Sequence, residues 1–326
     1  MGEGDNVEMT LDGVRVLVTG ASGRIGSVAS ARLSAAGALV TALSDRDNPD
    51  LVADRVFLGD VRNEEDVARA IEGAELVVHL AALAHRDAAS PFQVYSTNVV
   101  ATFNVLAQAG ALGVKRAVVA GSINRFGVPM NLHPGLLPAY FPIDDDIPTD
   151  IGDWYSLSKL NDENTARMAA RVWGIDVVTL RFPHVNEEKA LQRMATRAAE
   201  DPTERASEGW SYLDVRDAAR AIELSLVAHT EGAVAFFLAA DNTLAPYRTD
   251  ELIDRYAPTT PRLRRFVERE VPIDLAPARE LIGFRAVHEL NIETRDLPEL
   301  LQSHDDETAL RDESASMTPP HQRINP

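Results

Sequence analysis

The segment VRVLVTGASGRIG (residues 14–26) decides how this chain folds. It begins as an apolar run of strand-forming residues and passes into three glycines spaced three residues apart. Such glycines let the chain turn tightly and let a pyrophosphate approach the backbone, while the start of the following helix offers N–H donors. A purely structural glycine turn is the alternative, but a strand before the turn and a helix after it favour dinucleotide binding. The residues predicted to bind the dinucleotide here are Gly20, Ser22, Gly23, Arg24, Ile25 and Gly26.

The same rhythm of strand and helix continues to residue 182. Near-continuous runs of Val, Leu and Ile separated by helices are typical of a parallel sheet that is covered on both faces. The predicted fold is therefore α/β, with a Rossmann-type doubly wound parallel sheet. Strands are expected at residues 14–19, 39–44, 55–60, 75–82, 115–122 and 176–182, and helices at 24–36, 64–71, 91–112 and 153–173.

Beyond residue 182 strands and helices no longer alternate regularly, which predicts a smaller interleaved C-terminal lobe on the substrate side. We expect residues 12–182 to form the nucleotide-binding domain, with a helix and a strand in residues 214–240 returning to it. Residues 183–213 and 241–302 would then form the substrate lobe. Residues 1–11 and 303–326 are polar and charged without a hydrophobic period, which predicts mobile ends.

Composition narrows the classes of function. A chain of 326 residues with 45% hydrophobic content can bury a large core, and the absence of cysteine excludes disulfides and thiolate metal sites. No metal site is expected. The formal charge of −18 disfavours nucleic acid and anionic membrane surfaces as partners. No apolar run approaches the roughly 20 residues of a membrane span, and the first dozen residues lack the pattern of a signal peptide, so a cytoplasmic location is expected.

Tyr155 and Lys159 form the candidate catalytic pair. They stand four positions apart (i, i+4) on a predicted helix, so both side chains lie on one helix face. A free tyrosine has a pKa near 10, and a neighbouring ammonium group favours its phenolate form, which can act as a general base. The chain has six tyrosines and only three lysines, so chance rarely gives this spacing. An exposed helix pair without a catalytic role is the alternative.

These motifs together resemble the extended branch of the short-chain dehydrogenase/reductase superfamily, the NAD-dependent epimerase/dehydratase family. The glycine spacing is the form common in that superfamily, and the Tyr155/Lys159 pair matches its catalytic pair. The segment YLDVRDAA (residues 212–219) resembles a segment that opens a late helix in the extended branch, and Asp214 is expected to cap that helix. A further likeness lies in residues 276–284, so the resemblance covers roughly residues 13–290.

The resemblance implies several substrate-side roles. Ser122, at the end of the fifth strand, matches the serine that orients the substrate, and Asn98 matches a helix asparagine that supports the active-site network. Asn124 and His184 are expected to contact substrate, although His184 stands where the branch usually has asparagine, which leaves the choice of substrate open. Arg216 would either face substrate anions or pair with Asp217.

The resemblance also implies the cofactor contacts. Asp45 ends the second strand, where a carboxylate would accept both adenosine ribose hydroxyls and repel a 2′-phosphate, which favours NAD over NADP. Ser44 could face the ribose instead, and Arg46 could hold a phosphate. The other expected cofactor contacts are Asp60, Val61, Leu80, Ala81, Ala82, Lys159, Phe182 and Pro183.

The expected activity is hydride transfer between a sugar-type hydroxyl carbon and the nicotinamide of NAD. Net dehydrogenation and epimerisation of a nucleotide sugar both stay open, whereas the Thr-Asp-Glu run of related dehydratases is missing. Only 32 residues separate His184 from Asp217, which favours a small sugar-like substrate. The long loop between Ser122 and Tyr155 is either a substrate lid or a surface excursion. A non-catalytic dinucleotide sensor is the rival from another class, and the family analogy implies a homodimer formed through the helices at 91–112 and 153–173.

Overall fold

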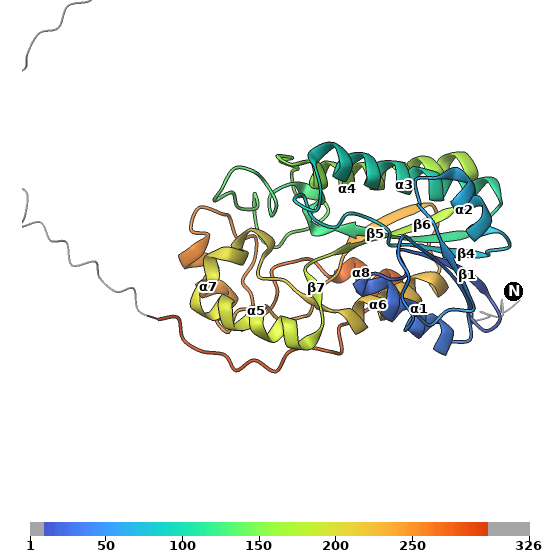
Figure 1. Cartoon of the computed structure of the whole chain (residues 1–326). Coiled ribbons are helices and arrows are strands. Elements are labelled where there is room, and N and C mark those ends of the chain that lie inside the picture. Colours follow the sequence, from blue (N-terminus) through green and yellow to red (C-terminus); the bar gives the residue numbers. More distant parts are fainter. Residues whose placement is uncertain (1–9, 299–326) are drawn as a thin grey trace, which may run out of the picture. The chain divides into compact units, whose positions relative to one another are not determined.

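A parallel β-sheet forms the centre of the protein (Figure 1). A computed structural model describes residues 10–298, and the compact unit considered below ends at Asp296. Seven strands pair in parallel in the order β3-β2-β1-β4-β5-β6-β9, so the chain reverses its direction of travel across the sheet between β1 and β4. Ligands of such sheets bind beyond the carboxyl ends of the strands near that reversal. The strands are β1 (Arg15–Thr19), β2 (Leu39–Ser44), β3 (Arg55–Leu58), β4 (Leu76–His79), β5 (Arg116–Ser122), β6 (Asp176–Phe182) and β9 (Ala233–Phe237).

Helices cover both faces of the sheet, as the apolar strand runs predict. Successive strand residues point to opposite faces, so Val16 and Val18 join one core cluster and Leu17 joins the other. The first cluster lies under α1, α6 and α8 and the second under α2, α3 and α4, on opposite sides of the sheet in Figure 1. These helices are α1 (Arg24–Ala35), α2 (Glu64–Ile71), α3 (Pro91–Ala111), α4 (Trp154–Trp173), α6 (Val215–Val227) and α8 (Ala276–Ile282).

The helix that carries the candidate catalytic pair begins at a defined cap. The side chain of Asp153 accepts a hydrogen bond of 2.9 Å from the backbone N–H of Ser156, which fixes the first turn of α4. The predicted cap of α6 is confirmed, because Asp214 accepts from the backbone N–H of Arg216 at 2.9 Å. Both caps hold an active-site segment in register with the sheet.

The segment after β6 contains elements that the sequence pattern did not reveal. They are β7 (Val185–Asn186), which pairs with β8 (Leu213–Asp214), the helix α5 (Glu188–Glu200) and the 3-10 helix η2 (Pro202–Glu208). Trp210 is fully buried behind η2 and donates its indole N–H to the carbonyl of Pro202 at 2.7 Å. The 3-10 helix η1 (Ile123–Phe126) and the helix α7 (Thr249–Tyr256) complete the described elements.

Part of the long loop between β5 and α4 is packed into the core. Phe141 and Ile143 are fully buried, and the ring of Phe141 stacks on Trp210 with 6.3 Å between centroids. Arg181 pairs with Asp145 of this loop and donates to Glu163 of α4 at 2.8 Å. The idea of a surface excursion is therefore wrong for this part of the loop, because its apolar side chains belong to the core.

The predicted division into two domains stays a prediction. Leu11, near the start of the described chain, is buried in the core cluster with α1. The expected mobile ends are residues 1–11 and 303–326; the burial of Leu11 makes this expectation wrong for that residue, and residues 1–9 and 303–326 lie outside the described residues. From residue 10 to residue 298, no helix combines the length and the apolar character needed to cross a membrane.

Candidate active site

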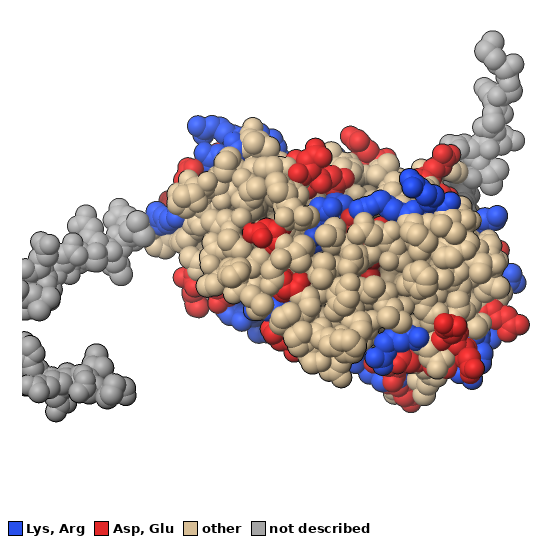
Figure 2. Space-filling view, turned by 90° about the horizontal axis from the view of Figure 1, so that it is seen from above, with Lys and Arg blue, Asp and Glu red and all other residues tan. Residues whose placement is uncertain are grey.

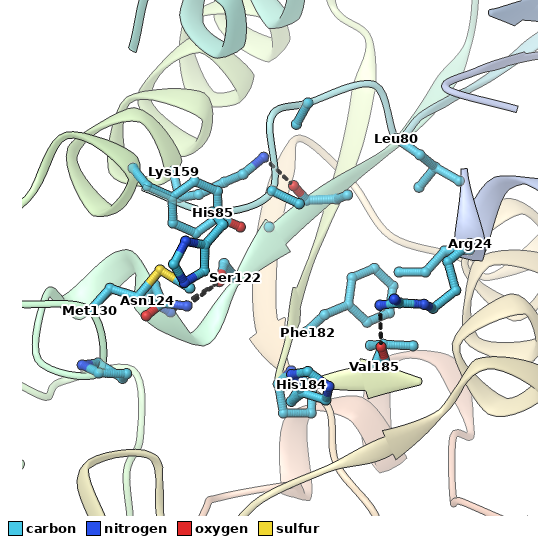
Figure 3. A pocket seen from close by; sticks show the side chains of 18 of the residues that line it. Arg24, Leu80, His85, Ser122, Asn124, Met130, Lys159, Phe182, His184 and Val185 are labelled. Carbon is cyan, nitrogen blue, oxygen red and sulfur yellow. Dashed lines mark hydrogen bonds between the residues drawn. The ribbon is translucent and has the colours of Figure 1, made fainter. Parts of the chain in front are cut away.

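A cavity of about 770 Å³ lies at the carboxyl edge of the sheet. It runs from the glycine-rich turn after β1, past the start of α4, to η2 (Figure 3). The predicted site residues that line it are Gly20, Gly23, Arg24, Ile25, Gly26, Leu80, Ala82, Ser122, Asn124, Tyr155, Lys159, Phe182, Pro183 and His184. One space thus collects the cofactor, catalytic and substrate candidates.

The turn after β1 tolerates only glycine at two positions. A Cβ on Gly26 would lie 2.2 Å from the carbonyl oxygen of Gly20, and a Cβ on Gly20 would lie 2.7 Å from the backbone nitrogen of Ala81. Gly20 also has a φ of +67°, which favours glycine. The first turn of α1 carries no acidic side chain, so its N–H groups and positive dipole end fit the pyrophosphate of a dinucleotide.

Tyr155 and Lys159 lie together on the buried side of α4. The Tyr155 side chain is 6% exposed, and the Lys159 ammonium lies 6.0 Å from the centre of its ring. Lys159 donates to the carbonyl oxygen of Ala120 at 2.9 Å and to Oδ2 of Asp162 at 3.0 Å. Burial alone would lower the pKa of Lys159, but the charges of Asp162 and Tyr155 outweigh burial and raise it. The lysine therefore stays cationic beside the phenol.

Ser122 and Asn124 form a hydrogen-bonded pair at the end of β5. The Ser122 hydroxyl oxygen accepts from both the backbone N–H and the side-chain amide of Asn124, each at 3.1 Å (Figure 3). The amide oxygen of Asn124 is buried without a hydrogen-bond partner among the described residues. A buried acceptor of this kind is costly unless a ligand donates to it, which suits a substrate hydroxyl group.

Asn98 does not line the cavity but supports its wall. Its amide accepts from the backbone N–H of Leu83 at 2.8 Å and donates to the Ser158 hydroxyl at 3.0 Å. Asn98 thereby ties α3 to the segment after β4 and to the helix of Tyr155. The structure is consistent with the expected supporting role and shows no contact between Asn98 and the cavity.

Several predicted contacts lie outside the cavity lining. Arg216 is bound by Asp214 at 2.8 Å and by Glu188 at 3.3 Å, so the expected pairing with Asp217 is wrong. Asp217 instead accepts from the backbone N–H groups that follow α8 and pairs with His288. The other predicted residues absent from the lining are Ser22, Asp45, Asp60, Val61 and Ala81.

The adenosine end presents a cation where the sequence analysis expected a carboxylate. Arg46 lines the cavity and donates to the carbonyl of Ser22 at 3.3 Å, whereas Asp45 is exposed outside the lining and Ser44 is buried. Asp60 pairs with Arg62, whose hydrogen bond holds the pKa of that carboxyl below its ordinary value. The expected contact between Asp45 and the ribose remains a prediction.

The substrate end contains residues that sequence reasoning missed. His85 and Met130 come from two loops that Arg86 ties together through the carbonyl oxygens of Met130 and Asn131. Pro129 also comes from the loop that was expected to be a substrate lid or a surface excursion. The other lining residues outside the predicted set are Ala84, Ala120, Gly121, Val185 and four residues from η2, namely Glu204, Arg205, Ser207 and Glu208. No local motif marks them.

His184 occupies the centre of this end (Figure 3). Burial, followed by the charges of Arg205, Arg24 and Arg197, lowers the pKa of His184 to about 4. The ring is therefore neutral near pH 7 and can both donate and accept hydrogen bonds. Arg205 is paired with Glu208 on the same turn of η2.

Comparison with known proteins agrees with this fold and site. Residues 16–235 match the model of the NAD dependent epimerase/dehydratase family. The chain therefore belongs to that family, as its motifs predict. No group of three or more His, Cys, Asp or Glu residues that could hold a metal ion occurs in the part of the chain that the structure describes.

Two relatives illustrate the range of the family. L-arabinose 1-dehydrogenase (NAD(P)(+)) of Haloferax volcanii is 34% identical over 173 residues, which are 52% of this chain and 66% of that protein. UDP-glucose 4-epimerase of Corynebacterium glutamicum is 30% identical over 178 residues, 53% of this chain and 51% of that protein. The aligned stretch spans less than two thirds of each relative's length.

Solved structures confirm the predicted α/β fold. The UDP-glucose 4-epimerase from Brucella ovis in complex with NAD has a TM-score of 0.63 at 21% identity, covering 85% of this chain and 94% of that chain. MoeE5 in complex with UDP-glucuronic acid and NAD has a TM-score of 0.62 at 24% identity, covering 84% and 94%. At these identities the likeness concerns the fold.

Proposed function

We propose that the protein is an NAD-dependent oxidoreductase that transfers hydride between a sugar-type hydroxyl carbon and nicotinamide. The observation that carries this proposal is the meeting of the glycine-rich turn and the Tyr155/Lys159 pair in one cavity. A dinucleotide whose pyrophosphate lies at Gly26 would extend along the strand ends toward Tyr155. Membership of the family and the sugar-converting activities of its named relatives support the same conclusion.

The residues of the chain supply binding and proton transfer. The N–H groups at the start of α1 hold the pyrophosphate, and Phe182 and Pro183 flank the nicotinamide end. When bound, the cofactor supplies a carbon that accepts or returns hydride. Ser122 hydrogen-bonds the reacting hydroxyl group, Tyr155 removes its proton, and the Lys159 ammonium stabilises the phenolate.

Replacing Tyr155 with phenylalanine tests this assignment. General acid–base groups contribute about 10²- to 10⁴-fold to turnover, so Y155F should lower kcat by about a thousandfold while NAD still binds. Tyr140→Phe is the matched control, because the Tyr140 hydroxyl donates to Asp144 and does not line the cavity. Turnover by Y155F at the wild-type rate would remove Tyr155 from the mechanism.

The preferred cofactor in this proposal is NAD, with NADP as the alternative. Solved structures of the same fold with bound NAD support this preference. Arg46 lines the cavity and one relative is named for NAD(P)(+), so NADP is tested as well. Fluorescence titration with NADH and NADPH decides between them. Binding of neither nucleotide would contradict the proposed function.

Net dehydrogenation of a sugar and epimerisation of a nucleotide sugar remain the two candidate outcomes. The short segment between β6 and α6, whose η2 residues line the cavity, favours a small sugar-like substrate. A screen of free sugars, sugar acids and UDP-sugars for NADH formation and for epimer exchange separates them. NADH accumulation identifies a dehydrogenase, and product epimers without net NADH identify an epimerase.

A homodimer through α3 and α4 is part of this proposal. Phe92, Val100 and Phe103 of α3 and Leu157 and Val172 of α4 have exposed fractions of 38% to 80%. Figure 2, which looks onto these helices, shows a broad surface with charged side chains gathered mainly at its margins. Exposed apolar side chains on two neighbouring helices are the kind of surface that a two-fold interface would bury.

Sedimentation of Phe103→Glu tests the dimer. This variant should sediment as a monomer, whereas Val267→Glu, at a 75% exposed apolar residue outside these helices, should sediment like the wild type. An unchanged dimer in the first variant would place the interface elsewhere. The proposed cytoplasmic location is tested separately by cell fractionation.

A further inference from the structure

A row of buried polar side chains lies behind Lys159. It comprises Thr19 of β1, His79 of β4, Thr102 of α3 and Asp162 of α4, each at most 2% exposed. None of them lines the cavity, and the mechanism proposed above uses none of them. Buried polar groups of this kind are retained only when their partners are well placed.

Hydrogen-bond contacts connect these side chains in series from Thr19 to Asp162. The backbone N–H of Ala81 lies 3.5 Å from the Thr19 hydroxyl oxygen, which lies 2.7 Å from Nδ1 of His79. Nε2 of His79 lies 3.1 Å from the Thr102 hydroxyl oxygen. If Thr19 donates to Nδ1, the imidazole carries its proton on Nε2 and donates to Thr102. The Thr102 hydroxyl proton is then left to face Asp162. Burial raises the pKa of the Asp162 carboxyl, whereas the charge of Lys159 and the hydrogen bonds of Lys159 and Thr102 act against burial and favour the charged form.

Asp162 supplies the negative charge nearest to the Lys159 ammonium. The carboxylate accepts from Nζ through Oδ2 at 3.0 Å, while its Oδ1 is buried without a hydrogen bond of ordinary geometry. The other groups that face Lys159 are Tyr155 on the same helix and His79 on β4. Burial and the charge of Lys159 lower the pKa of His79 to about 3, so His79 stays neutral.

The contacts also orient the ammonium group. Of its three N–H bonds, one points to the carbonyl of Ala120 and one to Asp162, which leaves a third for the side of the cavity. A lysine that lost its proton would keep two N–H bonds and no charge. It could then neither stabilise a phenolate nor hold three partners at once.

We propose that Asp162 is a positioning residue that keeps Lys159 protonated and directed toward Tyr155, with Thr102 and His79 holding the Asp162 carboxylate in place. The catalytic consequence rests on the proposed function, since it concerns Tyr155 as the base. The effect of Asp162 on the protonation of Lys159 involves only residues of the protein. It can therefore be measured without knowledge of the substrate.

Competitive acetylation of the intact protein with acetic anhydride measures the protonation of Lys159 directly. Only three lysines are present, so peptide mass spectrometry resolves Lys159 from the references Lys115 and Lys189. In the wild type the labelling midpoint of Lys159 should lie at or above that of the references. An opposite charge at this range shifts a pKa by about 1 to 3 units, so Asp162→Asn should lower the midpoint by at least about one pH unit.

Glu163→Gln is the matched control. Glu163 is the adjacent buried carboxylate of α4, but it pairs with Arg181 and Arg125 instead of Lys159. The control should lower thermal stability and leave the Lys159 midpoint in place. Asp162→Glu restores the charge and should move the midpoint back toward the wild-type value.

Activity provides the second readout. Once a substrate is found, kcat of Asp162→Asn should begin to fall at a pH at least about one unit below the pH at which the wild type begins to fall, because the cation is lost above the lysine pKa. Equal Lys159 midpoints in the wild type and Asp162→Asn would overturn the proposal. If Asp162→Asn does not fold, a wild-type midpoint below those of Lys115 and Lys189 overturns it. Failure of NAD binding and of all turnover would instead overturn the proposed function.

Discussion

The two ends of the cavity are built in different ways. The cofactor end consists of backbone held at close range, where the Cβ of a residue other than glycine at position 26 would lie 2.2 Å from a carbonyl oxygen. The substrate end consists of side chains from a 3-10 helix, including the ion pair of Arg205 and Glu208. A backbone site admits one ligand shape and few substitutions, whereas a side-chain site can change its ligand by exchanging residues. We expect mutations to separate these two behaviours.

The largest expected effect comes from the anchor of the substrate end. Trp210→Ala removes a fully buried indole and its bond to Pro202, which should lower the free energy of unfolding by about 4 kcal/mol. Folded protein should still bind NAD but show a raised KM for substrate, because η2 loses its support. Denaturant unfolding measures the loss, with Val267→Ala, at a 75% exposed residue outside the proposed dimer surface, as a control that changes stability little. Weakened NAD binding would show that the two ends are coupled.

A substitution in the glycine-rich turn should weaken binding of the dinucleotide rather than of the substrate. Gly26→Ala should weaken dinucleotide binding by about a hundredfold, near 3 kcal/mol, because the turn must open to admit the methyl group. Gly113→Asn is the control, since Gly113 has a φ of +73° with no atom within 4 Å of an added Cβ and asparagine tolerates this conformation. Titration with NADH measures both. If Gly26→Ala binds NADH as tightly as the wild type, close backbone packing at the turn does not determine dinucleotide binding.

The pH dependence of stability reports on two histidines, His184 at the substrate end and the buried His79 behind Lys159. The pKa values of His79 and His184 are lowered to about 3 and about 4, so the unfolded chain binds protons that the folded chain does not. This stabilisation is complete above the unfolded value of about 6.5 and is lost as pH falls toward 4. Each histidine should contribute about 2 kcal/mol of loss between pH 6.5 and 5. Thermal unfolding of His184→Asn should show a shallower decline than the wild type, and an unchanged decline would contradict the low pKa of His184.

The smallest expected effect concerns the ion pair at the substrate end. Glu208→Gln leaves Arg205 without its carboxylate partner. The ratio of kcat/KM for sugar acids to kcat/KM for neutral sugars should therefore rise severalfold. NAD affinity should not change. An equal effect on acidic and neutral sugars would indicate that Arg205 does not face the substrate.

Local patterns predicted the cofactor end and the catalytic helix well. The glycine spacing, the alternation of apolar runs and the four-residue step from Tyr155 to Lys159 each depend on neighbours in sequence, so one segment contains all the information. The fold and the family are confirmed, and Ser122 and His184 line the cavity with these residues. Their chemical roles remain predictions.

The substrate end could not be predicted because it depends on contacts between distant segments. Arg205 and Glu208 belong to a 3-10 helix that Trp210 and Phe141 hold in place, and no hydrophobic period marks such a helix. The pairing of Arg216 with Asp217 was wrong because Asp214, the helix cap, lies closer to the guanidinium group. Arg46 rather than Asp45 lines the cavity; both residues follow the end of β2, where no strand period fixes which side chain turns inward.

The outermost strand β3 has a consequence for handling the protein. It has four residues, with exposed fractions of 49% at Val56 and 59% at Leu58. Its outer edge pairs with no strand among residues 10–298, so it presents an apolar edge there. Exposed edge strands can pair with strands of other molecules and so promote aggregation. Short strands and cationic side chains usually protect against this pairing. Arg55, which covers the Phe57 ring at 5.0 Å, provides that protection here. Neutralising it is expected to promote precipitation in concentrated solutions long before it disturbs the fold.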